Sequence, residues 1–231
     1  MSGRPPSSPS SARDRPGVTP FRSVVFDVDS TLTGIEGIDW LAARRGLELA
    51  AEIAELTQQA MDGTVPIDRL YGLRLDMVRP TRQDLDELAT AYEVEVAPGA
   101  RALVLELMEA GLQLRIISGG IRGAVVPFAR WLGIPAPAVH AVEVRVDASG
   151  HYAGWDAASL LATATGKGTV LKSLGLPGPI LGVGDGITDL SLRAGGASVA
   201  AYTGFVRRET VVQGADHLVT SFDELRSLVL P

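Results

Sequence analysis

The sequence contains no cysteine, which excludes disulfide bonds and thiolate metal sites. Its three histidines are isolated and fit no metal-binding spacing, so oxygen ligands remain, and with them a hard cation such as Mg²⁺. No apolar run reaches the roughly 18–20 residues that a membrane span needs. Acidic residues outnumber basic ones, and the net charge of −6 argues against nucleic acid or an anionic membrane as a partner.

What the sequence does contain is enough apolar material for one folded core. A chain of 231 residues with 46% hydrophobic residues suits an α/β core with a small insert. Residues 1–20 differ from the rest, because they are rich in proline, serine and arginine and lack the apolar stretch of a secretory signal. We expect them to form a disordered N-terminal tail rather than a transit peptide, and we expect the protein to be cytoplasmic.

Two acidic residues follow a short apolar run near the N-terminus. Residues 24–26 are typical of a buried strand, and Asp27 and Asp29 come at its end. Open α/β sheets bind their ligands at the carboxyl ends of their strands. Two carboxylates placed there repel each other and lose hydration, which costs stability unless a cation or a reaction uses them. For such a pair taken alone, the alternative is a turn that caps the next helix.

A second acidic loop follows the apolar residues 179–181. It contains Asp185 and, four residues later, Asp189, among glycines that permit tight turns and close approach of the backbone. This loop also follows a predicted buried strand, so it repeats the arrangement seen at Asp27. Asp189 alone would also suit the start of a helix, where the helix dipole favours an acidic residue.

Two further segments suit the binding of an anion. Ser118 and the two glycines after it end an apolar run and open a predicted helix, whose first backbone N–H groups would attract an anion. Ser118 as a simple N-cap residue is the alternative. Lys167 lies at the start of another predicted helix, a position that the helix dipole disfavours, so its presence needs another reason. Acid pair, hydroxyl, lysine and acid pair in this order form a specific signal.

Apolar periodicity divides the chain into a core and an insert. Between residues 33 and 96 apolar residues recur at mostly helical spacing, and no strand-like run occurs. We therefore predict a small helical cap at 34–95, inserted after the first strand into a core formed by 21–33 and 96–231. The helices predicted in the cap cover 36–56, 67–77 and 81–92.

The core alternates strands and helices, which predicts an α/β fold with a Rossmann-like, mostly parallel sheet flanked by helices. An exposed strand is expected over 139–146, followed by a hairpin turn at 147–150. The remaining strands are predicted at 23–28, 112–117, 179–183, 197–201 and 217–219, and the helices at 98–110, 121–132, 167–174 and, in a short form, after Ile187.

These motifs resemble those of the haloacid dehalogenase superfamily of phosphohydrolases, and within it those of the phosphoserine phosphatases. The resemblance runs from about Arg22 to the C-terminus. Glu36 and Arg74, taken with the segment around Ser118, point to the phosphoserine branch. The closest matches are FDVDSTLTGIEGIDWLA (26–42), AMDGTVPIDRLYGLRL (60–75), IISGGIRG (116–123), TGKG (165–168) and VGDGITDL (183–190).

The resemblance implies a Mg²⁺-dependent phosphatase that works through an aspartyl phosphate. Asp27 would be the nucleophile, and Asp29 the general acid and then the general base. Mg²⁺ would be bound by Asp27, Asp185 and the backbone carbonyl of Asp29. Asp189 would lie behind them and orient water or the lysine. The phosphate would be bound by Ser118, Gly119, Lys167 and Thr188.

The resemblance also implies that the insert recognises the substrate. Phosphoserine carries an ammonium and a carboxylate besides its phosphate, and an acid and an arginine complement these groups. Glu36 and Arg74 match the positions for these two tasks, and the loop containing Met61 and Gly63 would close over the site. The expected reaction is hydrolysis of O-phospho-L-serine to L-serine and phosphate, the last step of serine biosynthesis.

Several alternatives stay open at this point. One is a phosphatase or phosphotransferase for phosphohomoserine or another small phosphorylated metabolite, although Glu36 with Arg74 favours an amino-acid head. A catalytically silent regulator that binds Mg²⁺ and phosphate is disfavoured, because every catalytic position is filled. Arg208 lies either near the site or at the surface. The expected partner is a small phosphomonoester, and the protein is either a monomer or a homodimer.

Overall fold

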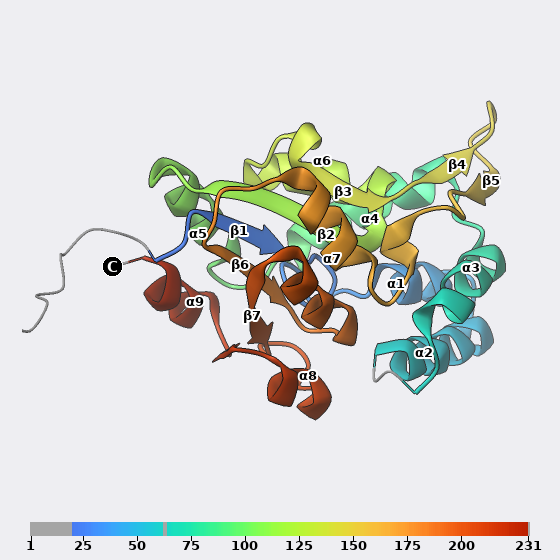
Figure 1. The fold of residues 1–231 in the computed structure, drawn as a ribbon. Coiled ribbons are helices and arrows are strands. Elements are labelled where there is room, and N and C mark those ends of the chain that lie inside the picture. Colours follow the sequence, from blue (N-terminus) through green and yellow to red (C-terminus); the bar gives the residue numbers. More distant parts are fainter. Residues whose placement is uncertain (1–19, 62–63, 231) are drawn as a thin grey trace, which may run out of the picture.

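The described residues form a sheet of six parallel strands at the centre of the molecule (Figure 1). The computed structural model describes residues 20–61 and 64–230. The strand order is β3-β2-β1-β6-β7-β8, which confirms the predicted α/β fold with a mostly parallel sheet. The strands are β1 (Ser23–Phe26), β2 (Gln113–Ile121), β3 (Val139–Val142), β6 (Ile180–Gly184), β7 (Ala197–Tyr202) and β8 (His217–Val219).

Strand β1 lies in the middle of this sheet, and all four of its residues are buried. A central parallel strand is covered on both faces, so it needs such a continuous apolar run. Phe26 at its end pairs with Ile116 of β2 on one side and with Val183 of β6 on the other. The strand order changes direction between β1 and β6, so the crevice where such sheets bind ligands lies at the carboxyl end of β1.

Helices cover both faces of the sheet. With the right-handed connections that are the rule for parallel strands, this strand order puts α5 and α6 on one face and the 3₁₀ helix η3 and α8 on the other. Helix α7 packs on η3, and α9 packs on α5. The bounds are α5 (Ala100–Glu109), α6 (Arg122–Leu132), α7 (Gly166–Leu174), η3 (Ile187–Gly195), α8 (Glu209–Gly214) and α9 (Phe222–Val229).

Between β1 and α5, the described part of the chain contains four further helices. The prediction of one helix over 36–56 is wrong, because two helices form there and the helical conformation is interrupted at Gly46. The φ angle of Gly46 is +132°, a value that glycine adopts readily and other residues rarely do. Helix α4 begins at a capping box, in which Thr81 and Asp84 bond to each other's backbone. The cap boundaries, 34–95, stay a prediction. The helices are α1 (Gly37–Ala43), α2 (Leu47–Met61), α3 (Ile67–Val78) and α4 (Arg82–Val94).

Residues 139–146 differ from the prediction of one exposed strand. Strand β3 belongs to the edge of the main sheet, whereas β4 (Val144–Val146) pairs antiparallel with β5 (Tyr152–Trp155) outside it. Apolar alternation continues across the junction, so the sequence does not reveal this change of partner. The turn predicted at 147–150 is confirmed, since Gly150 N–H donates to the carbonyl oxygen of Asp147 and Ser149 N–H donates to Asp147 Oδ1. Tyr152 of this hairpin donates to Asp76 Oδ1 of α3 at 2.7 Å.

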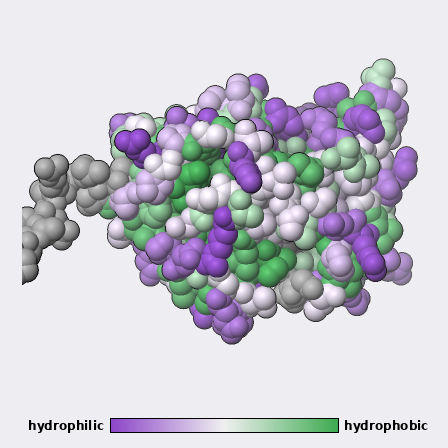
Figure 2. Space-filling model, viewed as in Figure 1, coloured by the Kyte–Doolittle hydropathy of each residue, from purple (hydrophilic) through white to green (hydrophobic). Residues whose placement is uncertain are grey.

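Hydrophilic and hydrophobic residues are interspersed over the face of the molecule shown in Figure 2. No helix within the described residues combines the length and the apolar character that crossing a membrane requires. Residues 1–19, which make up nearly all of the predicted disordered tail, lie outside the described residues.

Candidate active site

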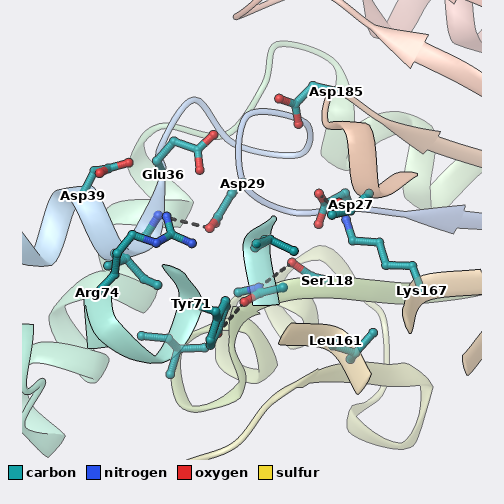
Figure 3. Close-up of a pocket in the computed structure, with 17 residues that line it drawn as sticks. Asp27, Asp29, Glu36, Asp39, Tyr71, Arg74, Ser118, Leu161, Lys167 and Asp185 are labelled. Atoms are coloured by element: carbon teal, nitrogen blue, oxygen red, sulfur yellow. Dashed lines mark hydrogen bonds and ion pairs between the residues drawn. The ribbon is translucent and has the colours of Figure 1, made fainter. Parts of the chain in front are cut away.

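The carboxyl ends of β1, β2 and β6 and the start of α7 surround one pocket, which residues of α1 and α3 close from the other side (Figure 3). Asp189 is buried next to this pocket. Of the other residues predicted from the sequence, Gly63 and the side chain of Met61 lie outside the described residues. The predicted residues that line the pocket are Asp27, Asp29, Glu36, Arg74, Ser118, Gly119, Lys167, Asp185 and Thr188.

A buried lysine joins two of the acidic residues. Lys167 lies in the first turn of α7, and its Nζ is 2.6 Å from Asp27 Oδ2 and 2.7 Å from Asp189 Oδ1. Burial alone would lower the pKa of this ammonium group, but the carboxylates of Asp189 and Asp27 outweigh that effect and raise the pKa above its ordinary value. Lys167 therefore carries a positive charge beside Asp27. Asp189 is expected to orient either water or the lysine, and in the structure its carboxylate is bonded to Lys167.

The second acidic loop is paired with an arginine. Arg208 Nη1 forms an ion pair with Asp185 Oδ2, and Arg208 Nη2 lies 3.7 Å from Glu36 Oε1. Burial raises the pKa of the Asp185 carboxyl well above its ordinary value, and the charge of Glu36 adds to this effect while Arg208 opposes it. Arg208 is itself buried. Of the two positions that the sequence left open for Arg208, the structure shows the one beside the site.

Asp29 is held by groups from the helices of the insert. The hydroxyl of Tyr92, in α4, donates to Asp29 Oδ1 at 2.6 Å, and the backbone N–H of Gly37 donates to Oδ2 at 3.1 Å. Burial raises the pKa of Asp29 to about 7, with the Tyr92 hydrogen bond opposing the shift and the charge of Asp27 adding to it. A carboxyl group with this pKa exchanges its proton near neutral pH, as a general acid and base must.

Arg74 and Glu36 face the pocket from the insert. Arg74 is buried, and its Nη1 donates to Thr57 Oγ1 at 2.7 Å, which in turn donates to Asp39 Oδ1 at 2.8 Å. Arg74 Nε is buried and has no hydrogen-bond partner among the described residues. Leaving such a donor unpaired costs about 1–3 kcal/mol, so a ligand with an acceptor would be favoured here. Ser30 donates to Glu36 at 2.8 Å, and burial raises the pKa of Glu36 to about 8.

The segment around Ser118 differs from the expected strand end and helix start. Strand β2 continues to Ile121, which is also the N-cap residue of α6, so the alternative of Ser118 as an N-cap is wrong. Ser118 is buried, and its Oγ accepts a bond from Gly120 N at 2.9 Å. Tyr71 of α3 donates to the carbonyl oxygen of Gly119 at 2.6 Å (Figure 3). The groups available to an anion here are those of an irregular strand end, not of a helix start.

The acidic residues fit a hard divalent cation. One carboxylate oxygen from each of Asp27, Asp185 and Asp189 lies within 4.8 Å of the other two. Oxygen ligands of this kind suit Mg²⁺, and a cation would offset both the burial and the neighbouring negative charges that raise the pKa of Asp185. The predicted ligand set contains the backbone carbonyl of Asp29 in place of Asp189, which is bonded to Lys167. That ligand set stays a prediction.

Several residues that contact the site were not predicted from the sequence, and three of them carry hydroxyl groups on helices. Thr57, Tyr71 and Tyr92 each lie on a helix between β1 and β2 at positions where the spacing indicates only a buried side chain. No local signal shows that their hydroxyl groups reach Arg74, Gly119 or Asp29. Only the way in which the helices pack on the sheet brings these groups together.

Comparisons with known proteins agree with this geometry. Residues 24–193 match the haloacid dehalogenase-like hydrolase family. Phosphoserine phosphatases from Bos taurus and Homo sapiens are each 37% identical over 206 residues, which cover 88% of this chain and 91% of theirs. The crystal structure of a phosphoserine phosphohydrolase-like protein from Francisella tularensis gives a TM-score of 0.83 at 27% identity, over 90% of this chain and 100% of that one. This chain therefore belongs to the haloacid dehalogenase-like hydrolase family, and within it to the phosphoserine phosphatases.

Proposed function

We propose that this protein hydrolyses O-phospho-L-serine to L-serine and phosphate, the last step of serine biosynthesis, through an aspartyl phosphate on Asp27. The observation that carries the proposal is the division of the pocket between Asp27 with Lys167 on one side and Arg74 with Glu36 on the other. Phosphoserine offers a phosphate to the first pair, and a carboxylate and an ammonium to the second. The similarity of this chain to phosphoserine phosphatases supports the same substrate.

In the first step, Asp27 attacks phosphorus while the bond to the serine oxygen breaks. The leaving oxygen keeps the electron pair of that bond and takes a proton from Asp29, a type of assistance worth about 10²–10⁴ in rate. Lys167, with Nζ 2.6 Å from Asp27 Oδ2, offsets the negative charge of the nucleophile and the phosphoryl group. Ser118, Gly119 N–H and Thr188 bind the phosphoryl oxygens.

In the second step, Asp29 is a carboxylate and takes a proton from the water that attacks the aspartyl phosphate. Asp27 is released as a carboxylate, and phosphate leaves. The pKa of about 7 suits Asp29 to both steps, because it is protonated in part and ionised in part near neutral pH. Asp27, Asp185 and the backbone carbonyl of Asp29 would hold Mg²⁺, which would supply charge neutralisation for the phosphoryl group.

Recognition of the amino-acid head falls to the insert. Arg74 binds the substrate carboxylate, which supplies an acceptor for the buried and unpaired Nε. Glu36 binds the ammonium, whose charge offsets the burial that raises the pKa of Glu36. The loop of Met61 and Gly63 closes over the bound substrate. A cytoplasmic location and a monomeric or homodimeric state complete the proposal.

Phosphate release from a panel of phosphorylated small molecules, with and without Mg²⁺, tests this function. The panel contains phosphoserine, phosphothreonine, phosphohomoserine and p-nitrophenyl phosphate, and we expect phosphoserine to be hydrolysed fastest. Chelation with EDTA should abolish activity and Mg²⁺ should restore it, whereas Ca²⁺ should restore it poorly because of its longer bonds and higher coordination number. Preference for another member of the panel would overturn the substrate, and full activity in chelator would overturn the role of Asp185.

A further inference from the structure

Tyr92 lies 63 positions after Asp29 in the sequence, yet its hydroxyl group contacts the carboxyl group of Asp29, the proposed general acid. Its side chain is 0% exposed, and its ring packs on Phe128 of α6 with the ring centroids 5.5 Å apart. The hydroxyl donates to Asp29 Oδ1 at 2.6 Å. A buried phenol needs a hydrogen-bond partner. Here that partner is the carboxyl group of Asp29, the proposed general acid and base.

The backbone at Gly37 leaves room for this contact. A Cβ atom placed on Gly37 would lie 2.4 Å from the hydroxyl oxygen of Tyr92, so any side chain there would displace the phenol. The N–H of the same glycine donates to Asp29 Oδ2 at 3.1 Å. Asp29 is therefore held on both oxygens, on one by a phenol and on the other by the backbone.

We propose that Tyr92 is a positioning residue, which holds the Asp29 carboxyl group in the orientation from which it protonates the leaving oxygen. The inference rests on the proposed function in one respect, the role of Asp29 as general acid. Proton transfer requires the acid to lie within hydrogen-bond reach of the leaving oxygen and in line with it. Two bonds from opposite sides restrict rotation of the carboxyl group, whereas one bond alone leaves it free to turn.

The substitution Tyr92→Phe removes the donor and keeps the ring that packs on Phe128. Its effect should depend on how strongly the leaving group needs a proton. Phenyl phosphate releases a basic phenolate, whereas p-nitrophenyl phosphate releases a weakly basic one that departs with little assistance. A purely structural role of Tyr92 would slow both substrates alike, because it would disturb the nucleophile as much as the acid.

The test measures release of the phenol in the first turnover, with Mg²⁺ present, because this step reports transfer of the phosphoryl group to Asp27 alone. For Tyr92→Phe we expect release from phenyl phosphate to slow about tenfold, and release from p-nitrophenyl phosphate to change less than about twofold. The matched control is Tyr152→Phe, which removes a similar phenol–carboxylate bond of 2.7 Å to Asp76, outside the pocket. This control should change neither rate.

Equal slowing of the two substrates by Tyr92→Phe, or no slowing of either, overturns the proposal. If Tyr92→Phe does not fold, Gly37→Ala carries the same test, since the added methyl group would push the Tyr92 hydroxyl away from Asp29 without replacing the tyrosine. Neither substrate has an amino-acid head, so the result does not depend on phosphoserine being the substrate. A wild-type enzyme that hydrolyses both phenyl phosphates but not phosphoserine overturns the proposed function, and the comparison of the two leaving groups still decides the role of Tyr92.

Discussion

The two halves of the pocket are held in place in different ways. Asp27 and Asp185 directly follow β1 and β6, and Ser118 lies in β2, two residues past the last residue that pairs with β1; the pairing along β1 runs without interruption. Glu36 and Arg74 come from the helices between β1 and β2, and each is held by a hydrogen bond to another side chain, at 2.8 Å and 2.7 Å. The backbone of the sheet therefore positions the first group, and side chains position the second.

This difference indicates how the two halves respond to substitution. Backbone pairing survives the replacement of a single side chain, whereas one replacement removes a side-chain hydrogen bond that contributes about 0.5–1.5 kcal/mol. We infer that the sheet fixes the chemistry and that the insert fixes the choice of substrate. Changes in the first half should then affect every substrate, and changes in the second half only those that carry an amino-acid head.

The substitution Asp27→Asn should abolish the chemistry of the half of the pocket that is formed by the sheet. It keeps the shape of the side chain and removes the charge that is proposed to attack phosphorus, so turnover of every substrate should fall at least about 10³-fold. Asp86→Asn, at an exposed position of α4, is the matched control and should leave turnover unchanged. Steady-state phosphate release measures both. Near-normal turnover in Asp27→Asn would contradict the mechanism.

The substitution Arg74→Ala should affect the second half alone. Loss of the proposed contact with the substrate carboxylate, worth about 1.5–3 kcal/mol in all, should lower kcat/KM for phosphoserine roughly 10–150-fold. Hydrolysis of p-nitrophenyl phosphate, which has no carboxylate, should change little. Arg69→Ala, at an exposed position of the same helix, is the control and should affect neither substrate. An equal loss on both substrates would show that Arg74 supports the structure of the insert instead.

The pH dependence of the first turnover should sharpen the comparison, because Asp29 belongs to the chemical half but is held from the insert. Its pKa is raised to about 7, so the protonated form required of a general acid predominates below that pH and is lost above it. First-turnover release of phenol from phenyl phosphate should therefore fall about tenfold per pH unit above 7. p-Nitrophenyl phosphate should show a weaker dependence. A flat profile for phenyl phosphate would exclude Asp29 as the acid.

Asp84→Ala should destabilise the insert and leave the chemistry intact. Asp84 bonds to Arg45 and closes the capping box of α4, so its loss should lower the free energy of unfolding by about 1–2 kcal/mol, with turnover unchanged. Although burial opposes it, hydrogen bonding to Arg45 and Thr81 lowers the pKa of Asp84 below its ordinary value. This stabilisation is therefore present above about pH 4 and is lost as the pH falls further.

Urea denaturation at pH 7 and at low pH measures this difference. The difference in the free energy of unfolding between wild type and Asp84→Ala should become smaller at low pH. The exposed control Asp86→Ala should have the same free energy of unfolding as wild type at either pH. If the difference in the free energy of unfolding does not change with pH, the charge of Asp84 contributes nothing to stability.

Elements that follow from local pattern were predictable, and contacts between distant segments were not. The apolar run before Asp27 marks a buried strand, and parallel topology then brings the other strand ends to the same edge. The bond between Tyr92 and Asp29 joins residues 63 positions apart, and no periodicity shows which buried hydroxyl group will reach an acid. The pairing of Asp185 with Arg208 likewise depends on where the chain runs after β7.

The central position of β1 also affects how the protein folds as it is synthesised. Its two partners in the sheet are residues 113–116 and 180–183, so the earliest described strand waits for segments that are synthesised much later. Pairing over such distances is slow, because long loops must close before the contacts form. Until then the apolar edges of β1 remain open to pairing with other chains. We therefore expect the yield of active enzyme to depend on temperature during synthesis and on the supply of chaperones.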